Sequence, residues 1–165
     1  MNLHEEGIIM KKIKILFVCK GNICRSTMAQ FLMLHKLREN KIEDWFYIDS
    51  AATTDEQIGK NIAPGTIQKL EENNIEYEEH HARQITPEDY QKFDYIIAMD
   101  NLIINDIYEM VEKDMEYKIF RLYDFSTEKF DIVDPIYTND FDRTYREVNF
   151  GCDMFLKYLK KKHKI

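Results

Sequence analysis

The chain of 165 residues has few cysteines, no long apolar run and no excess of positive charge. The three cysteines lack CxxC spacing, so neither a disulfide scaffold nor a zinc site is indicated. No apolar run approaches the length of a transmembrane helix, and the formal net charge of -7 argues against a general binder of nucleic acid or anionic membranes. The five histidines show no metal-ligand spacing. We therefore expect neither a metal nor another cofactor.

The amino-terminal residues do not resemble a targeting segment. Met1 to Met10 include charged residues and no extended apolar core, so we do not expect a signal peptide. We expect residues 1–10 to form a flexible extension, with Met10 as an alternative start, and residues 11–165 to form one domain. Hydrophobic residues make up 44% of the sequence, which is typical of a soluble globular protein. The cytoplasm is the expected compartment.

The most informative stretch is residues 13–29, IKILFVCKGNICRSTMA. A β-rich run leads directly into Cys19, and Arg25 and Ser26 then open a helical pattern. A strand, a tight loop and a helix present backbone N–H groups to an anion. The helix dipole and a guanidinium are the influences that turn a cysteine thiol into a reactive thiolate. This arrangement predicts attack by Cys19 on a bound phosphoryl group, with Arg25 pairing two phosphoryl oxygens.

The residues between the thiol and the helix suit a loop that wraps an anion. Gly21 and Asn22 are residue types that tolerate positive φ. Because the whole chain is acidic, an anion must be captured by a local positive site, for which Lys20, Arg25 and the loop amides are the candidates. The expected phosphate-binding loop consists of Lys20, Gly21, Asn22, Ile23, Cys24 and Ser26.

Strand-like and helix-like segments alternate along the chain. We expect strands near residues 13–18, 45–51, 93–99 and 118–122. We expect helices from Ser26 or Thr27, from Pro64, through residues 103–110, and along residues 141–159. This order predicts a single-domain α/β fold with a central four-stranded parallel sheet, helices on both faces and the phosphate-binding loop after the first strand. The apolar run at residues 45–48 predicts a strand that is covered on both faces, not an edge strand with one wet face.

The pattern Cys-x5-Arg-Ser directly after the first strand resembles the low-molecular-weight protein tyrosine phosphatases. The resemblance covers roughly residues 13–160, and further blocks follow in the family's order at residues 49–53, 81–86, 93–100 and 134–137. In other cysteine phosphatases with the same loop, the loop that carries the acid precedes the cysteine. Here the Asp-Pro pair lies far downstream.

The resemblance assigns roles to individual residues. It implies that Cys19 is the nucleophile, that Arg25 clamps the phosphate and that Ser26 steadies the thiolate. It implies that Asp134 first donates a proton to the leaving group and then activates the water that breaks the phosphocysteine. Pro135 limits the backbone of Asp134, which helps to hold that acid over the loop.

Supporting roles are less sharply indicated. By resemblance, Ser50 and His80 brace the phosphate-binding loop, although His80 is also consistent with a surface histidine. Cys24 is either a core residue or, as the resemblance implies, a thiol that resolves oxidised Cys19 through a disulfide. Cys152 lies at a helical core position and is expected to be inert packing.

Three positions depart from the family's usual pattern. Thr27 stands where the family usually has proline, Glu56 where an aromatic residue is common, and Ile136 where a tyrosine follows Asp-Pro. The resemblance places Glu56, Ile136 and Tyr137 at the walls of the slot that grips the substrate ring. These departures bear on substrate preference and leave the core chemistry untouched.

The expected function is metal-free hydrolysis of phosphotyrosine in a partner protein through a phosphocysteine, by a monomer or weak homodimer. A phosphoarginine phosphatase is the first alternative, but Ile23 stands where the resemblance places a threonine in such enzymes. A thioredoxin-coupled arsenate reductase needs further redox cysteines, and none lies between Cys24 and Cys152. The intact set of Cys19, Arg25 and Asp134 argues against a phosphate-binding module without catalysis.

Overall fold

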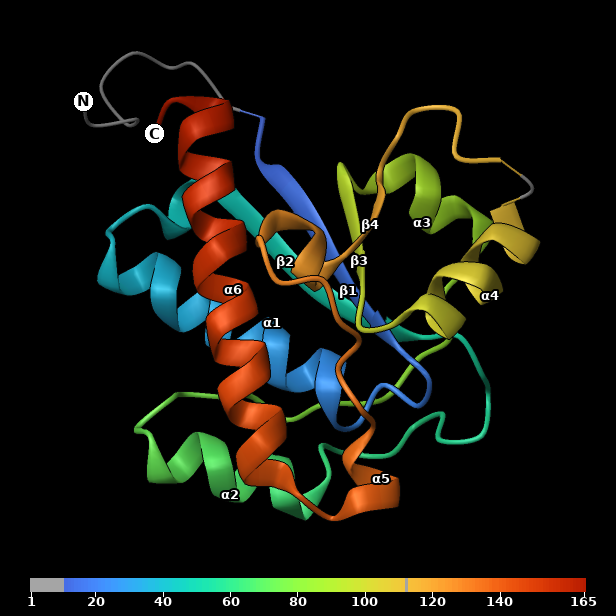
Figure 1. Ribbon diagram of the computed structural model, residues 1–165, viewed down its shortest axis with the longest axis vertical. Helices are drawn as coiled ribbons and strands as arrows, with labels where there is room; N and C mark the ends of the chain where they lie inside the picture. The colour runs from blue at the N-terminus through green and yellow to red at the C-terminus, as the bar shows by residue number, and fades with distance from the viewer. Residues whose placement is uncertain (1–10, 112) are drawn as a thin grey trace.

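Strand β1 (Ile13–Cys19) lies inside a four-stranded sheet with β2 (Phe46–Ala52), β3 (Tyr95–Ala98) and β4 (Ile119–Arg121). The computed structural model describes residues 11–111 and 113–165 (Figure 1). The strand order is β2-β1-β3-β4, and all three pairs are parallel. The predicted α/β fold with a four-stranded parallel sheet is confirmed. The prediction for residues 1–10 falls outside the described residues.

Helices cover both faces of this sheet (Figure 1). One face packs against α1 (Arg25–Glu39), α2 (Pro64–Glu72) and α6 (Phe141–His163). The other packs against α3 (Pro87–Lys92) and α4 (Asn101–Val111). Short elements complete the described chain: α5 (Pro135–Thr138) and the 3-10 turns η1 (Glu43–Trp45) and η2 (Leu122–Phe125).

The alternation of side chains along β1 explains the two cores. Ile15 and Phe17 point into the core beneath α1 and α6, whereas Leu16 and Val18 join the core beneath α3 and α4. All four side chains are fully buried. A parallel strand covered on both faces explains why this segment is an unbroken apolar run.

The second strand differs from its prediction. β2 is the edge strand of the sheet, with β1 as its partner strand and one isolated parallel bridge from Ala52 to Gln84, and Tyr47 is 39% exposed. Trp45 belongs to η1 and not to the strand. The apolar run misled the interpretation because Tyr47 is covered only in part, by the ring of Phe93 and by the ammonium of Lys92, 4.8 Å from the centre of its ring.

Most predicted helix boundaries agree with the structure to within a residue or two, but α6 ends at His163, four residues beyond its predicted end, and α3 was not predicted as a helix. α1 begins at Arg25, one residue before the first predicted position. Thr27, which replaces the family's proline, uses its hydroxyl to donate to the carbonyl of Cys24 at 3.0 Å. The four-residue helix α5 was not predicted. No helix within residues 11–111 or 113–165 has both the length and the apolarity that a bilayer crossing requires.

Candidate active site

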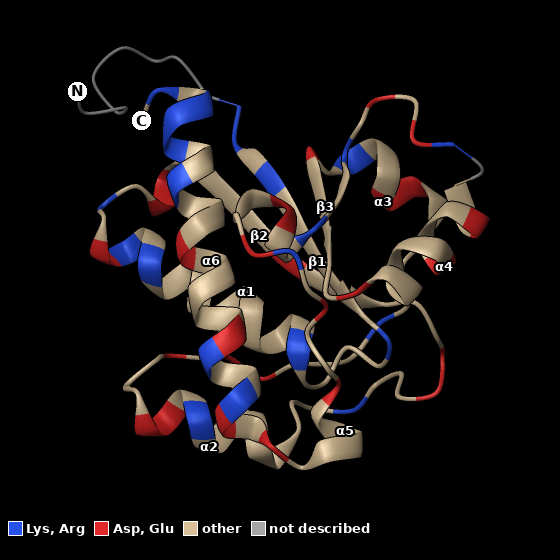
Figure 2. Ribbon diagram, in the orientation of Figure 1, with Lys and Arg blue, Asp and Glu red and all other residues tan. Residues whose placement is uncertain are grey.

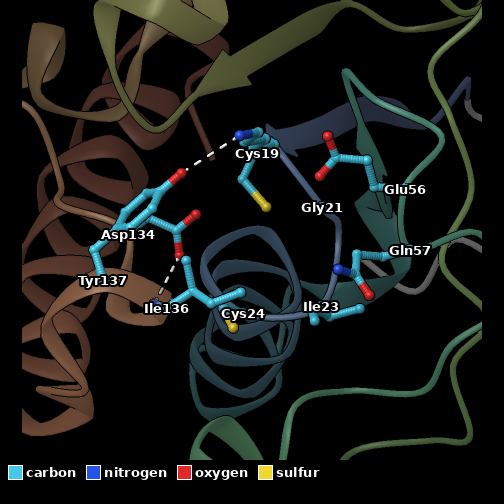
Figure 3. Close-up of a pocket in the computed structure, with 10 residues that line it drawn as sticks. Cys19, Gly21, Ile23, Cys24, Glu56, Gln57, Asp134, Ile136 and Tyr137 are labelled. Carbon is cyan, nitrogen blue, oxygen red and sulfur yellow. Dashed lines mark hydrogen bonds between the residues drawn. The ribbon is translucent and has the colours of Figure 1, made fainter.

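A pocket of about 130 Å³ opens at the carboxyl end of β1 (Figure 3). Ligands of parallel α/β sheets bind at this edge, where the loops after the strands meet. The thiol of Cys19 lies at the base of the pocket, and the residue is only 3% exposed. The lining residues come from the loop after β1, from the segment after β2 and from the start of α5: Cys19, Lys20, Gly21, Ile23, Cys24, Glu56, Gln57, Asp134, Ile136 and Tyr137.

The thiol of Cys19 is surrounded by groups that stabilise negative charge. Its Sγ lies 3.1 Å from Oγ of Ser26, and the backbone N–H of Asn22 donates to it at 3.3 Å. Ser26 belongs to the first turn of α1, whose amino end carries a partial positive charge. The structure therefore places the hydroxyl of Ser26 beside the thiol, and its role in steadying the thiolate stays a prediction.

Asn22 holds the loop in shape. It is fully buried with φ of 58°, a left-handed conformation that asparagine tolerates better than most residues. Its side-chain amide donates to Oγ of Ser26 and to Oγ of Ser50, both at 2.9 Å, and its carbonyl oxygen accepts from the backbone N–H of Arg83 at 3.1 Å. Both N–H groups of this side-chain amide and its oxygen therefore have hydrogen-bond partners. These bonds fix the loop before any ligand binds.

Ser50 and His80 both contact this framework. Nε2 of His80 lies 2.7 Å from the backbone carbonyl of Asn22, and burial lowers the pKa of this imidazole. A neutral ring that donates from Nε2 fits this contact. Ser50 accepts from Asn22 and donates to Oε1 of Gln30 at 2.5 Å, which extends the chain of hydrogen bonds into α1.

The guanidinium of Arg25 is 2% exposed, and two carboxylates and one backbone carbonyl hold it. Nη1 donates to Oδ2 of Asp100 at 2.6 Å and to the carbonyl of Ile132 at 2.7 Å, and Nη2 lies 3.4 Å from Oδ2 of Asp134. Burial alone would lower its pKa, but the charges of Cys19, Asp100 and Asp134 outweigh burial and raise it. Nε is buried and has no acceptor among the described residues. This leaves a donor that an oxyanion can use.

Asp134 caps the short helix α5. Its Oδ1 accepts from the backbone N–H of Ile136 at 3.1 Å, and Pro135 occupies the first helical position. The carboxyl group is 15% exposed and lines the pocket together with Cys19. A carboxyl group and a thiol that share one small pocket can serve proton transfer and nucleophilic attack on the same substrate.

The rim of the pocket is more exposed than its base. Ile136 and Tyr137 are 60% and 73% exposed, and Glu56 lies on the opposite wall (Figure 3). The ammonium of Lys20 donates to the hydroxyl of Tyr137 at 3.4 Å. That contact, helped by Glu56, raises the pKa of Lys20. Lys20 therefore faces the rim. The positive charge and the hydrogen-bond donors near the base come from Arg25 and the loop amides.

All three cysteines are buried and free. Cys24 lines the pocket, and burial, helped by Cys19, raises its pKa to about 12. Cys152 is packed in the core beneath α6, and burial raises its pKa to about 12 as well. The described residues contain no cluster of three or more side chains of the metal-ligating types.

The sequence interpretation missed three residues of the site. Asp100 holds Arg25, and its place two residues after the end of β3 is the signal that could have revealed it. Gln57 lines the pocket and packs against Gly21. A Cβ added to Gly21 would lie 3.1 Å from Cγ of Gln57. Gln30 extends the hydrogen bonds of Ser50, and no feature of the sequence marks it.

Comparison with known proteins agrees with this geometry. The family described as low molecular weight phosphotyrosine protein phosphatase matches residues 14–165. The chain belongs to this family. A low molecular weight protein-tyrosine-phosphatase, PtpA, of Staphylococcus epidermidis is 35% identical over 150 residues, which are 90% of this chain and 95% of the relative. The resemblance seen in the sequence is thereby confirmed.

Solved structures support the same assignment. YfkJ from Bacillus subtilis superposes with a TM-score of 0.90 at 33% identity, over 93% of this family member and 98% of the other chain. An arginine phosphatase from Drosophila superposes with a TM-score of 0.81 at 29% identity, over 90% and 98% of the two chains. The fold therefore serves proteins named for different phosphorylated amino acids.

Proposed function

We propose that this family member hydrolyses phosphotyrosine in a protein substrate through a phosphocysteine on Cys19. The observation that carries the proposal is the buried Arg25, whose Nη2 lies 3.4 Å from the carboxylate of Asp134 and whose pKa is raised by the charge of Cys19. The thiol of Cys19 and the carboxyl group of Asp134 line one pocket, and Nε of Arg25 has no acceptor among the described residues. A phosphoryl group bound by Arg25 and the loop amides would present its phosphorus to the thiol beneath it.

The reaction has two steps. In the first, the thiolate of Cys19 attacks phosphorus, the bond to the tyrosyl oxygen breaks, and Asp134 gives its proton to the departing phenolate. In the second, Asp134 takes a proton from water, the water oxygen attacks phosphorus, and the sulfur–phosphorus bond breaks to release phosphate. Arg25 and the backbone amides stabilise charge on the phosphoryl oxygens in both steps, so the proposed chemistry needs no metal.

The shape of the pocket favours an aryl ester. The thiol lies at the base, and the rim stands above it on both sides (Figure 3). A phosphotyrosine ring spans that depth and can contact Ile136 and Tyr137, whereas the short side chain of phosphoserine brings the peptide backbone against the rim. Ile23, which also lines the pocket, offers an apolar surface to the ring and no polar partner to a guanidinium.

A reduced compartment suits this chemistry. A thiol nucleophile with a second cysteine in the same pocket must remain reduced to act, and the cytoplasm maintains that state. We propose the cytoplasm as the compartment and a phosphotyrosine-containing protein as the partner. Whether the enzyme is a monomer or a weak homodimer stays a prediction.

The proposal is tested with matched peptides that carry phosphotyrosine, phosphoserine or phosphoarginine, each with and without a chelator. We expect turnover to be greatest with phosphotyrosine and unchanged by the chelator, with Cys19→Ser as the control for contaminating activity. Preferential release of phosphate from phosphoarginine would select the first alternative. Loss of activity in the chelator would contradict the metal-free mechanism. If none of the peptides is turned over, a phosphate-binding module without catalysis would be favoured instead.

A further inference from the structure

A second and larger cavity lies at the opposite end of the sheet from Cys19. Its volume is about 450 Å³, compared with about 130 Å³ for the pocket over the thiol, and it is more open to solvent than that pocket. Ile13 begins β1 and lines this cavity, whereas Cys19 ends the same strand, so the two sites are about 20 Å apart along the strand. The volume falls in the range of about 300–1,000 Å³ that is typical of small-molecule sites.

Aromatic side chains form the walls of this cavity. Tyr95, Phe120 and Tyr158 belong to one cluster of rings, and Tyr117 stands at the surface with 83% of its side chain exposed. The hydroxyl of Tyr95 lies 2.8 Å from Nε2 of His163, whose ring also lines the cavity. The walls therefore offer ring faces and edges to a flat ligand.

The rim of the same cavity carries positive charge. Lys11, Lys12 and Lys162 line it and are exposed. Figure 2 shows lysines gathered at the carboxyl end of α6 and at the start of β1, although the chain as a whole has a net charge of -7. In the described part of the chain, neither Lys12 nor Lys162 takes part in an ion pair.

Two acidic residues also line the cavity, and among the described residues only Glu116 has a cationic partner. Asp94 accepts from the backbone N–H of Lys14 at 2.9 Å, and the carboxylate of Glu116 lies 2.6 Å from the ammonium of Lys118. Burial lowers the pKa of His163, opposed by Asp94 and helped by Lys162. Asp94 keeps its negative charge, because a backbone N–H does not neutralise a carboxylate. The three lysines of the rim still outnumber this one unpaired carboxylate among the described lining residues.

We propose that this cavity is a second ligand site that takes a small aromatic anion of the nucleoside monophosphate class. The ring would lie against Tyr117 and Tyr158, and the phosphate would be paired by Lys12 and Lys162. Such a ligand uses both features of the site, because base–aromatic stacking and phosphate pairing act on different parts of the same molecule. The site is independent of the phosphate-binding loop.

The experiment is calorimetric titration of AMP into the full-length protein, with the phosphate-binding loop saturated by tungstate. We expect AMP to bind at one site, and both adenosine and inorganic phosphate to bind at least about tenfold more weakly, because each keeps only half of the recognition. Lys12→Glu and Lys162→Glu should each weaken AMP binding by about tenfold. Tyr117→Ser should weaken the binding of AMP but not that of phosphate.

Lys157→Glu is the matched control. It makes the same charge change on α6 at an exposed residue that does not line the cavity, and AMP binding should change by less than about twofold. Unchanged thermal unfolding of each variant shows that the fold is intact.

Three results that include a bound ligand would overturn the proposal. They are AMP binding that withstands both lysine reversals, inorganic phosphate that binds as tightly as AMP, and an acidic peptide without aromatic residues that binds as tightly as AMP. The last result would identify a peptide-docking surface instead. Failure of AMP to bind at all would also reject the site, and none of these results depends on phosphatase activity.

Discussion

The base and the rim of the pocket over Cys19 differ in how firmly their side chains are held. At the base, Asn22 is fully buried and its amide is hydrogen-bonded to Ser26, Ser50 and the backbone of Arg83. At the rim, Tyr137 is 73% exposed, and its hydroxyl accepts a hydrogen bond from the ammonium of Lys20 at 3.4 Å. The comparison indicates that the base is organised for chemistry in advance, while the rim is free to vary with the substrate.

This difference predicts how large the effects of substitutions will be. Changes at the base should act on the chemical steps and be large, because preorganised groups contribute most in the transition state. Changes at the rim should act on binding in the ground state and be small. The predictions below run from the first kind to the second.

The largest effect is expected at the proposed nucleophile. Cys19→Ser should abolish turnover because a serine hydroxyl in this site has no base to activate it, whereas the cradle of Arg25 and loop amides still binds phosphate or vanadate. Turnover assays and vanadate titration check the two halves of this prediction. Residual activity above the level of a contaminant would contradict the covalent mechanism.

A smaller but still large effect is expected at the proposed acid. Asp134→Asn cannot donate a proton, so hydrolysis of an ordinary phosphate ester should fall by roughly 10²–10⁴. The loss in the phosphorylation step should shrink as the leaving group becomes more acidic, because a stable phenolate needs less protonation. Single-turnover kinetics on a series of aryl phosphates measures this, and an equal loss for good and poor leaving groups would show that Asp134 is not the acid.

An intermediate effect concerns oxidation at the base. Brief treatment with peroxide should inactivate the enzyme reversibly through a Cys19–Cys24 disulfide. In Cys24→Ser, the fraction of activity that a thiol reductant restores should be about tenfold smaller. Burial raises the pKa of Cys24 to about 12, so its thiolate fraction at neutral pH is small and grows with pH. Disulfide formation should therefore be faster at pH 8 than at pH 7, both values lying below that pKa.

Mass spectrometry of the inactivated enzyme checks this prediction. The peptide pair that contains Cys19 and Cys24 should carry the disulfide, and Cys152, which is fully buried away from the pocket, should stay reduced. Absence of the disulfide from inactivated wild type would reject the resolving role of Cys24.

The smallest effect is expected at the rim. Glu56→Trp or Ile136→Tyr should lower KM for aryl phosphates by a few-fold, since an aromatic pair contributes about 0.5–1.5 kcal/mol beyond area burial. The value of kcat should stay nearly unchanged, which is the pattern of added uniform binding. Steady-state kinetics on both single variants and the double variant provide the test. If KM falls in none of them, these positions do not grip the ring.

Much of the fold could be predicted because its signals are local. The unbroken apolar run of β1 and the helical spacing of α6 each follow from burial, and the structure confirms both. The edge position of β2 could not be predicted in the same way, because strand order depends on contacts between distant segments. The helix α5 has four residues, too few to show a helical period.

The residues of the site likewise divide into those that a local motif reveals and those that depend on contacts between distant segments. The loop residues from Cys19 to Ser26 lie within one short motif. In the structure five of them line one pocket, and Ser26 contacts the thiol of Cys19. Asp100 contacts Arg25 across 75 positions of sequence, so its partner could not be predicted, although its place after a strand is a local signal that could have marked it as a site residue. Gln30 meets Ser50 in the same way, from a helix to the neighbouring edge strand.

The central claim is that hydrolysis passes through a phosphoryl group on Cys19, and rapid acid quench of the reaction tests it most directly. Asp134→Asn should slow the water step, so mixing this variant with phosphotyrosine peptide or a good aryl phosphate and digesting it should reveal one phosphoryl group on the peptide that contains Cys19. The same label should be absent from Cys19→Ser. A label on another residue, or turnover with no labelled enzyme at any time point in either wild type or Asp134→Asn, would contradict the account.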